Sequence, residues 1–315
     1  MTGDGDPTTT PGVPASRPPR HPRGLPGPLA ALERCLVMGV VNVTPDSFSD
    51  GGRWVDPAAA IARGLTLAAD GADILDVGGE STRPGAGRTD AGEELRRVVP
   101  VVEGLAEAGL TVSIDTMRAE VADAALAAGA VLVNDISGGL ADPDMAELVA
   151  DARVPFIAMH WRGASDRMEK LAVYGDVVGD VRAELARRVD ALVGAGVDAE
   201  RIVLDPGFGF AKRVEHGWLL LAWLDELVSL GHPLLVGASR KRFLGRAVTA
   251  PGQSELPHER DEATAATSTL AAAAGAWAVR VHETRASADA VRVVAEVVAA
   301  RATRAAAAGP SRSRS

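Results

Sequence analysis

Short apolar runs of β-type residues alternate along the chain with longer segments of helical period, and this alternation constrains the fold more than any other feature. Strands are expected at residues 36–43, 72–78, 110–115, 130–135, 155–160, 201–206, 233–239 and 277–282. Helices are expected at 57–70, 92–108, 118–128, 142–150, 175–195, 215–230, 261–275 and 287–300. Strands that are apolar on both faces and joined by helices indicate a parallel sheet covered on both sides. Eight such units predict an α/β fold, a single-domain (β/α)8 TIM barrel.

Almost every expected strand ends in a side chain that can bind or react. These residues are Asn42, Asp76, Asp115, Asn134, Asp135, Met159, His160, Asp205, Ser239, Lys241, Arg280 and His282. In a barrel they converge on the carboxyl-terminal mouth, where active sites are built. Any one of them is explained equally well as a helix cap or turn former, but a complete ring is not. A doubly wound open sheet is the structural alternative, and no G-x-G-x-x-G turn follows the first strand to support it.

Composition narrows the classes of protein. The chain has 315 residues, 47% of them hydrophobic, which is enough for one large domain. A net charge of -9 gives no broad basic surface for nucleic acid. No apolar run approaches the roughly 20 residues that span a bilayer, and the opening segment lacks the apolar core of a signal peptide. With a single cysteine, Cys35, these features predict a cytoplasmic protein without internal disulfides.

Both ends of the chain differ from its middle. Residues 1–30 are rich in proline, glycine and threonine, and 302–315 are rich in alanine and serine. Such segments bury too little apolar surface to compensate for the entropy of ordering, so we expect both to be disordered. The catalytic domain is expected at 31–301.

Seven segments carry a family resemblance. They are MGVVNVTPDSFSDGG at 38–52, ESTRPGAG at 80–87, SIDT at 113–116, VNDISG at 133–138, LDPGFGFAK at 204–212, VGASRKRF at 236–243 and RVH at 280–282. In this order they resemble the signature segments of the dihydropteroate synthases, folate-pathway enzymes that sulfonamides target. The resemblance covers about residues 36 to 298. It implies a transferase that joins 6-hydroxymethyl-7,8-dihydropterin pyrophosphate to para-aminobenzoate, releasing pyrophosphate and forming 7,8-dihydropteroate, with magnesium.

The resemblance also implies a role for each site residue. Asp115, Asn134 and Asp205 bind the pterin, whose edge of amide and amino groups requires carboxylate and amide partners. Lys241 donates to the pterin acceptors, Met159 packs near the ring, and the planar guanidinium of Arg280 stacks on it. Without the flanking motifs, the carboxylates are also explained as an acid/base couple or a divalent-metal site.

The remaining roles concern the leaving group and the second substrate. Asn42, Arg280 and His282 match the phosphate-binding positions of the family, and Asn42 matches the residue associated with Mg²⁺. The para-aminobenzoate pocket is expected to comprise Thr82, Arg83, Pro84, Phe210, Ser239 and Lys241. Segments 44–54 and 79–90 have the composition of lids over a substrate. Asp115, Lys241 and Arg280 are the expected catalytic residues. The sequence offers no nucleophile triad, so we expect no covalent enzyme intermediate.

Several features depart from the usual family pattern. Ala211 stands where many members have glycine, Gly217 and Trp218 follow His216, and Trp161 and Arg162 follow the fifth strand. These changes put the local loop geometry in doubt but remove no expected ligand.

Two functional alternatives stay open. A paralogue would bind pterin with little synthase activity, and a pterin-binding methyltransferase with a related barrel would act on a corrinoid partner. The intact residue set argues against the first, and the phosphate-directed RVH segment argues against the second. The resemblance further implies a homodimer, for which the alanine-rich helix at 261–275 is a candidate interface, although a core-facing helix shows the same pattern.

Overall fold

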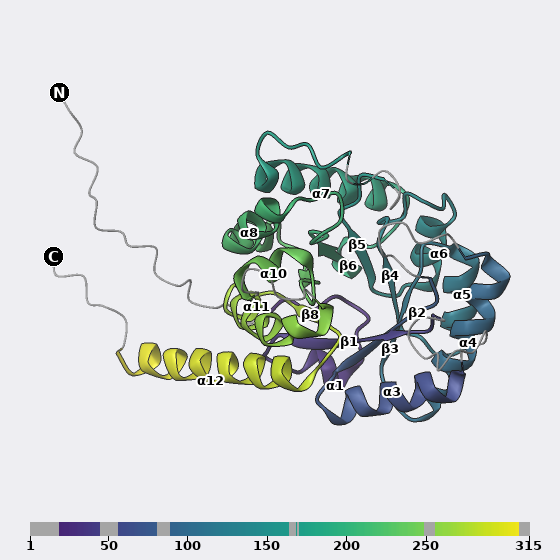
Figure 1. Ribbon diagram of the computed structural model, residues 1–315, viewed down its shortest axis with the longest axis horizontal. Coiled ribbons are helices and arrows are strands. Elements are labelled where there is room, and N and C mark those ends of the chain that lie inside the picture. Colours follow the sequence, from purple (N-terminus) through teal and green to yellow (C-terminus); the bar gives the residue numbers. More distant parts are fainter. Residues whose placement is uncertain are drawn as a thin grey trace.

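The computed structural model describes residues 19–44, 56–80, 89–163, 168, 170–248 and 256–308. Within these ranges eight strands form one parallel sheet in the order β6-β5-β4-β3-β2-β1-β8-β7. A parallel bridge between Leu204 and Leu234 links β6 to the residues before β7, so the sheet closes on itself (Figure 1). The strands are β1 (Leu36–Asn42), β2 (Ile74–Gly78), β3 (Val112–Asp115), β4 (Leu132–Asp135), β5 (Phe156–Met159), β6 (Ile202–Asp205), β7 (Leu235–Val236) and β8 (Ala278–Val281). The predicted TIM barrel is confirmed.

The helices surround the barrel (Figure 1). They are α1 (Gly27–Ala30), α3 (Pro57–Ala69), α4 (Ala91–Glu107), α5 (Ala119–Ala127), α6 (Met145–Ala152), α7 (Val177–Gly194), α8 (Val214–Ala222), α9 (Leu224–Val228), α10 (Arg242–Val248), α11 (Asp261–Ala273) and α12 (Arg285–Ala308), with 3-10 turns η1 (Ala199–Arg201) and η2 (Pro257–Arg260). The helix expected at 215–230 is divided at Trp223, whose ψ of 37° is not helical. Helix α10 is not among the predicted helices.

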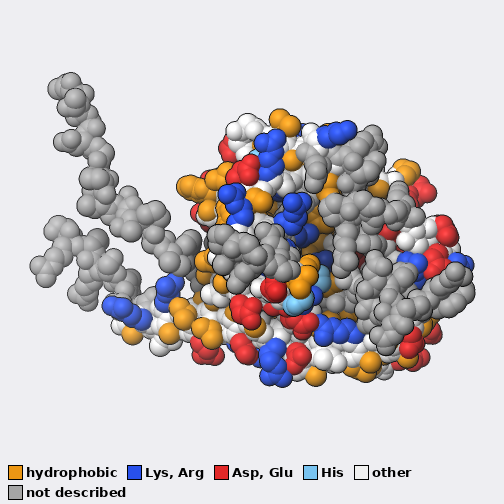
Figure 2. Space-filling view, in the orientation of Figure 1, with side chains coloured by type: hydrophobic (Ala, Val, Ile, Leu, Met, Phe, Trp, Pro, Cys, Tyr) orange, Lys and Arg blue, Asp and Glu red, His pale blue; other side chains and the backbone are white. Residues whose placement is uncertain are grey.

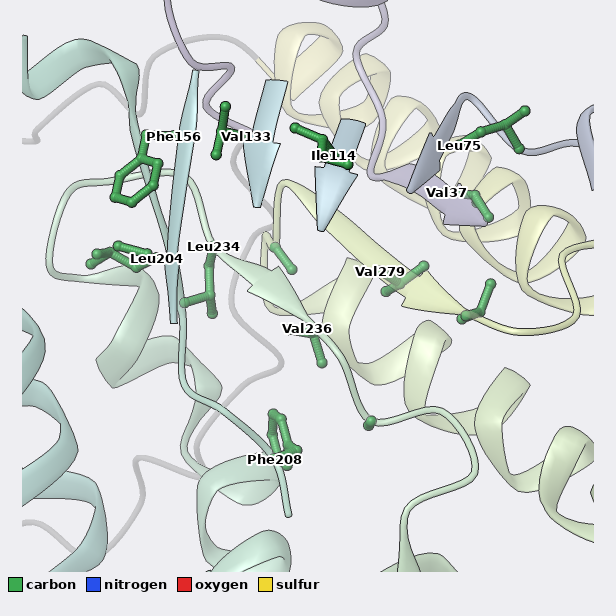
Figure 3. Packing of buried hydrophobic residues seen from close by; sticks show 14 of the residues in the cluster. Val37, Leu75, Ile114, Val133, Phe156, Leu204, Phe208, Leu234, Val236 and Val279 are labelled. Atoms are coloured by element: carbon green, nitrogen blue, oxygen red, sulfur yellow. The ribbon is translucent and has the colours of Figure 1, made fainter. Parts of the chain in front are cut away.

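Side chains alternate between two cores along each strand, as the period of two requires. Leu36, Met38, Ile74 and Leu132 belong to a cluster inside the barrel. Their neighbours, among them Val37, Leu75, Ile114 and Val133, belong to the larger cluster between the sheet and the helices (Figure 3). This alternation decides which of the polar residues at the strand ends face inward.

The amino-terminal segment packs against the barrel. Leu25 is buried and belongs to the interior cluster together with Leu36 and Trp277. The backbone N–H of Arg23 donates to Glu200 O at 2.8 Å. The described structure includes residues 19–30, before the predicted boundary at residue 30, and α12 continues past the predicted boundary at residue 301. The rest of the two segments predicted to be disordered, 1–18 and 309–315, lies outside the described residues. Apolar side chains at only a few positions are enough to order 19–30, and composition averaged over the segment does not reveal them.

Helices begin where carboxylates accept from the first free backbone N–H groups. Asp56 accepts from Ala58 N before α3, and Asp90 accepts from Glu93 N before α4. Both caps lie at the starts of the helices that follow β1 and β2. Most of the two segments predicted as lids, 44–54 and 79–90, lies outside the described residues. None of the helices in the described ranges is long and apolar enough to cross a membrane.

Candidate active site

A cavity of about 1010 Å³ opens at the carboxyl-terminal ends of the strands. Its opening is bordered by Lys and Arg side chains and by a histidine (Figure 2). Ten of the thirteen predicted site residues line it: Asn42, Asp115, Asn134, Met159, Asp205, Phe210, Ser239, Lys241, Arg280 and His282. The other three, Thr82, Arg83 and Pro84, lie outside the described residues. The structure thus brings together residues from six strands and from the loops that follow β6, β7 and β8.

Arg280 is held at the floor of the cavity by two carboxylates. Its Nε donates to Asp76 Oδ2 at 2.6 Å, and its Nη2 donates to Asp115 Oδ2 at 2.5 Å. Asn134 Nδ2 donates to the same Asp76 oxygen at 2.9 Å. Asp76 is fully buried, whereas the Arg280 side chain keeps 22% of its surface exposed. Asp76 therefore positions two predicted substrate-binding residues, a role that its place in the ring did not reveal.

Asp76 and Asp115 both accept hydrogen bonds from the Arg280 guanidinium, and the charges of this group shift the pKa values of Asp115 and Arg280. Burial raises the pKa of Asp115 to about 7; Arg280 opposes the shift and Asp76 adds to it. Burial alone would lower the pKa of Arg280, but Asp76 and Asp115 together raise it. The floor of the cavity thus carries a permanent cation next to a carboxyl group that titrates near neutrality.

Asp205 and Lys241 face the cavity from the neighbouring β6 and β7 side. The backbone N–H of Gly207 donates to Asp205 Oδ1 at 2.7 Å, and burial raises the pKa of this carboxyl group. Burial lowers the pKa of Lys241 to about 8, and Arg280 contributes to the shift. Lys241 Nζ lies 4.2 Å from the centre of the Phe210 ring. The ammonium group and the ring are therefore placed together in a cation–π contact.

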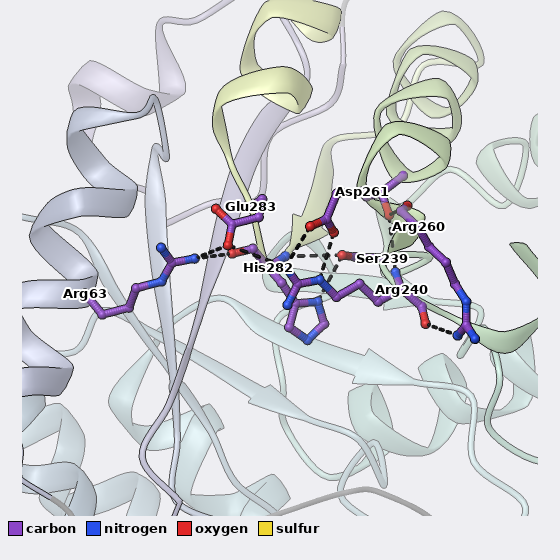
Figure 4. Close-up of polar contacts among 8 residues, drawn as sticks. Arg63, Ser239, Arg240, Arg260, Asp261, His282 and Glu283 are labelled. Carbon is purple, nitrogen blue, oxygen red and sulfur yellow. Dashed lines mark hydrogen bonds and ion pairs between the residues drawn. The ribbon is translucent and has the colours of Figure 1, made fainter. Parts of the chain in front are cut away.

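Ser239 and His282 contact each other at the rim of the cavity (Figure 4). Ser239 Oγ lies 2.9 Å from His282 Nδ1, and the backbone N–H of His282 donates to Ser239 Oγ at 3.2 Å. Arg63 Nη2 donates to His282 O at 2.8 Å. The contacts between Ser239 and His282 connect the ends of β7 and β8. A residue predicted for the para-aminobenzoate pocket and one predicted to bind phosphate therefore form one unit.

Arg240 occupies a left-handed conformation, with φ of 59°, between Ser239 and Lys241. Its guanidinium donates to both carboxylate oxygens of Asp261 at 2.8 Å (Figure 4). Arg260 Nη1 donates to Arg240 O at 3.0 Å. The start of α11 thus holds the backbone conformation that directs the two flanking side chains.

Two residues of the predicted ring serve the fold. Asp135 faces away from the barrel interior and accepts from Ser137 N and Gly139 N, both at 2.7 Å. It is a turn former, the alternative that the sequence left open. His160 is buried after β5 and contacts Glu184 and Lys212, at 2.9 and 3.0 Å. Asn134 and Asp135 are consecutive in β4, so their side chains point to opposite faces of the sheet. The period of two therefore predicts from sequence that only one of them faces the barrel interior.

Comparison with known proteins agrees with this geometry. The family model described as "Pterin binding enzyme" matches residues 38–282. The dihydropteroate synthase of Mycobacterium leprae is 58% identical over 266 residues, which cover 84% of this chain and 94% of that protein.

Two solved structures from Xanthomonas albilineans are similar over the same region. Its dihydropteroate synthase with 4-aminobenzoic acid matches with a TM-score of 0.77 and 46% identity, over 84% of this chain and 93% of that chain. The enzyme in complex with 7,8-dihydropteroate matches with a TM-score of 0.74 and 44% identity, over 84% and 94%. The resemblance noted in the sequence is confirmed: the chain belongs to the dihydropteroate synthase family of pterin-binding enzymes.

Proposed function

We propose that the cavity joins 6-hydroxymethyl-7,8-dihydropterin pyrophosphate to para-aminobenzoate, releasing pyrophosphate and forming 7,8-dihydropteroate. The protein is accordingly a transferase, the dihydropteroate synthase of folate biosynthesis. One observation carries the proposal: donors and acceptors for a pterin, cations for an anion, and an aromatic pocket all line the same cavity.

Asp115, Asn134 and Asp205 are proposed to pair with the amide and amino edge of the pterin. Asn134 and Asp205 are buried, with 3% and 6% of their surface exposed, so these hydrogen bonds would form away from water. Met159, which is 3% exposed, would pack near the ring. Arg280 would stack on the ring while its edge stays fixed by Asp76 and Asp115. This arrangement would orient the reacting methylene toward the rim.

The pyrophosphate is proposed to lie near Asn42, Arg280 and His282 at the ends of β1 and β8. Among the described residues no group of three or more His, Cys, Asp and Glu could hold a metal ion. The side-chain oxygen of Asn42 suits Mg²⁺, which usually takes few protein ligands and several phosphate oxygens and waters. Bound Mg²⁺ would neutralise charge on the departing pyrophosphate. Asn42 would hold it, and Arg280 would supply a second positive charge from the protein.

In the proposed reaction the carbon–oxygen bond breaks first, and its electron pair leaves with the pyrophosphate. The negative charge of the Asp115 carboxylate, held against the pterin, would stabilise the resulting cation. The amine of para-aminobenzoate then attacks this carbon and loses a proton to solvent. Phe210 and Lys241 would hold the aromatic ring and Ser239 its carboxylate, with Thr82, Arg83 and Pro84 as further predicted members of the pocket. No covalent bond to the protein is required.

Turnover by the purified protein tests the proposal. The protein is incubated with Mg²⁺, the pterin pyrophosphate and labelled para-aminobenzoate, and label in dihydropteroate is followed beside an Asp115→Asn control. Label transfer that requires Mg²⁺ and collapses in the control supports the synthase. Pterin binding without label transfer would instead support a pterin-binding paralogue.

A homodimer and a cytoplasmic location complete the proposal. Three apolar side chains of α8 and its end, Trp218, Leu219 and Trp223, are 37%, 46% and 51% exposed, and Leu270 of α11 is 54% exposed. Pairing of two copies through α8 and α11 would bury them. Sedimentation of the parent protein and of a Trp223→Glu variant tests this surface, since a monomeric parent would contradict it.

A further inference from the structure

The loop after β6 carries Phe210 into the cavity on a backbone that an L-amino acid rarely adopts. Ala211, next to Phe210, has φ of 47°, in the left-handed region. Its β-carbon crowds the neighbouring carbonyl in this conformation, which glycine adopts without that penalty. Other contacts must therefore hold Ala211, and with it the direction of the Phe210 side chain.

Two hydrogen bonds hold the carbonyl groups of Phe210 and Ala211. Lys212 Nζ donates to Phe210 O at 3.1 Å. The hydroxyl of Tyr174 donates to Ala211 O at 3.0 Å. Tyr174 lies before α7, about 37 residues away in sequence, so it ties the loop to a different part of the barrel. Together the two bonds fix the peptide groups that precede and follow Ala211.

Tyr174 is itself held in place. The guanidinium of Arg162 lies 3.8 Å from the centre of the Tyr174 ring, and His216 contacts the same ring edge-on at 5.0 Å. Arg162 also donates from Nη1 to Val173 O at 2.6 Å and from Nε to Glu184 Oε2 at 3.0 Å. Arg162 and Ala211, both departures from the usual family pattern, thus meet through one tyrosine.

Lys212 is held by a second chain of contacts. Its Nζ lies 3.0 Å from His160 Nδ1. Burial lowers the pKa of Lys212 to about 7. In its ammonium form Lys212 only donates, so Nδ1 accepts, and the remaining imidazole proton on Nε2 is donated to Glu184 Oε2 at 2.9 Å. Burial, together with the charge of Lys212, lowers the pKa of His160 to about 4, consistent with a neutral ring. Glu184 therefore supports both anchors, through Arg162 on one side and His160 on the other.

We infer that Tyr174 and Lys212 are positioning residues for the amine substrate: they hold Ala211 in its left-handed conformation and so keep the Phe210 ring against Lys241. The inference rests on the proposed function, in which Phe210 and Lys241 form the para-aminobenzoate pocket. The floor residues Asp76, Asp115 and Arg280 take no part in this clamp. The hydroxyl of Tyr174 donates to Ala211 O and not to a residue proposed to bind the pterin, so its loss should leave pterin binding unchanged.

Steady-state kinetics of Tyr174→Phe test the clamp, because this change removes a single hydroxyl. A hydrogen bond contributes roughly 1 kcal/mol, or about fivefold in affinity. We expect KM for para-aminobenzoate to rise about fivefold, with KM for the pterin pyrophosphate unchanged. Thr303→Val removes another hydroxyl that donates to a carbonyl, at 3.0 Å on α12, and should change neither constant.

Glycine at position 211 provides the rescue. Ala211→Gly in the Tyr174→Phe background should restore KM for para-aminobenzoate to within twofold of the parent, because glycine needs no clamp to adopt this φ. Phe210→Ala tests the proposed para-aminobenzoate pocket separately from the clamp. If it leaves KM for para-aminobenzoate unchanged, the proposed pocket is wrong. If it raises KM but Tyr174→Phe does not, or if Tyr174→Phe raises both KM values alike, the clamp is overturned.

Discussion

Replacement of Asp76 by asparagine removes the buried charge that holds Arg280 at the floor of the cavity. Asp76 is fully buried, and its Oδ2 accepts from both Arg280 Nε and Asn134 Nδ2, at 2.6 and 2.9 Å. Asparagine has nearly the same shape, so the change tests the charge and the hydrogen bonds with little effect on packing.

The expected loss of stability follows from these contacts. Breaking a buried ion pair typically costs about 3–5 kcal/mol, because the remaining charge loses its partner. Here Arg280 keeps Asp115, which limits the loss. The second oxygen, Asp76 Oδ1, has no partner among the described residues, so an amide nitrogen there would be a buried donor without an acceptor. We expect the free energy of unfolding to fall by about 3 kcal/mol, near the lower end of that range.

Catalysis should also suffer, because Arg280 and Asn134 lose a shared anchor. A displacement of about 1 Å at such positions can cost roughly 10²-fold in rate. We expect kcat/KM for the pterin pyrophosphate to fall by about that factor, with denaturant unfolding measured on the same preparation.

Asp73→Asn is the matched control, at the opposite end of the barrel. Asp73 accepts from Arg34 Nη2 at 2.7 Å and Nη1 at 2.8 Å, outside the cavity. The Asp73→Asn change should lower the free energy of unfolding while leaving kcat/KM within twofold of the parent. A loss of less than about 1 kcal/mol in Asp76→Asn, or an equal loss of activity in both variants, would show that Asp76 does not anchor Arg280 in this way.

Three further predictions concern the same structure. Because burial raises the pKa of Asp115 to about 7, its proton is held more tightly in the native than in the unfolded state, and the free energy of unfolding should decrease between about pH 4 and 7. Asp115→Asn should flatten this decrease in urea titrations at several pH values; an unchanged slope would contradict the assignment. Arg280→Lys should lower kcat/KM roughly 10²-fold with an unchanged circular dichroism spectrum, because an ammonium group cannot donate to Asp76 and Asp115 in the guanidinium geometry. Leu25→Ala should cost about 2–4 kcal/mol in urea unfolding but leave both KM values unchanged, since Leu25 is buried at the amino-terminal side of the barrel; a cost near zero would show that residues 19–30 add little to the core.

The site residues could be predicted where a recognisable motif marks the end of a strand. The motifs around Asn42, Asp115 and Asp205 placed each side chain at the mouth of a barrel, and all three line the cavity. Composition failed at residues 19–30, because only a few apolar side chains order that segment. It also missed the division at Trp223, where one continuous apolar pattern covers two helices.

The sequence is enough to predict the barrel, because the alternation of apolar strands and helices is local information repeated eight times along the chain. It also determined which residues reach the mouth, since the end of each strand is marked by its own side chains. Which of these residues touch one another depends on the three-dimensional fold. Arg280 meets Asp76 and Asp115 across separations of 204 and 165 residues, and Tyr174 meets Ala211 across 37. Pairings of this kind depend on barrel closure and strand register, which no local pattern encodes.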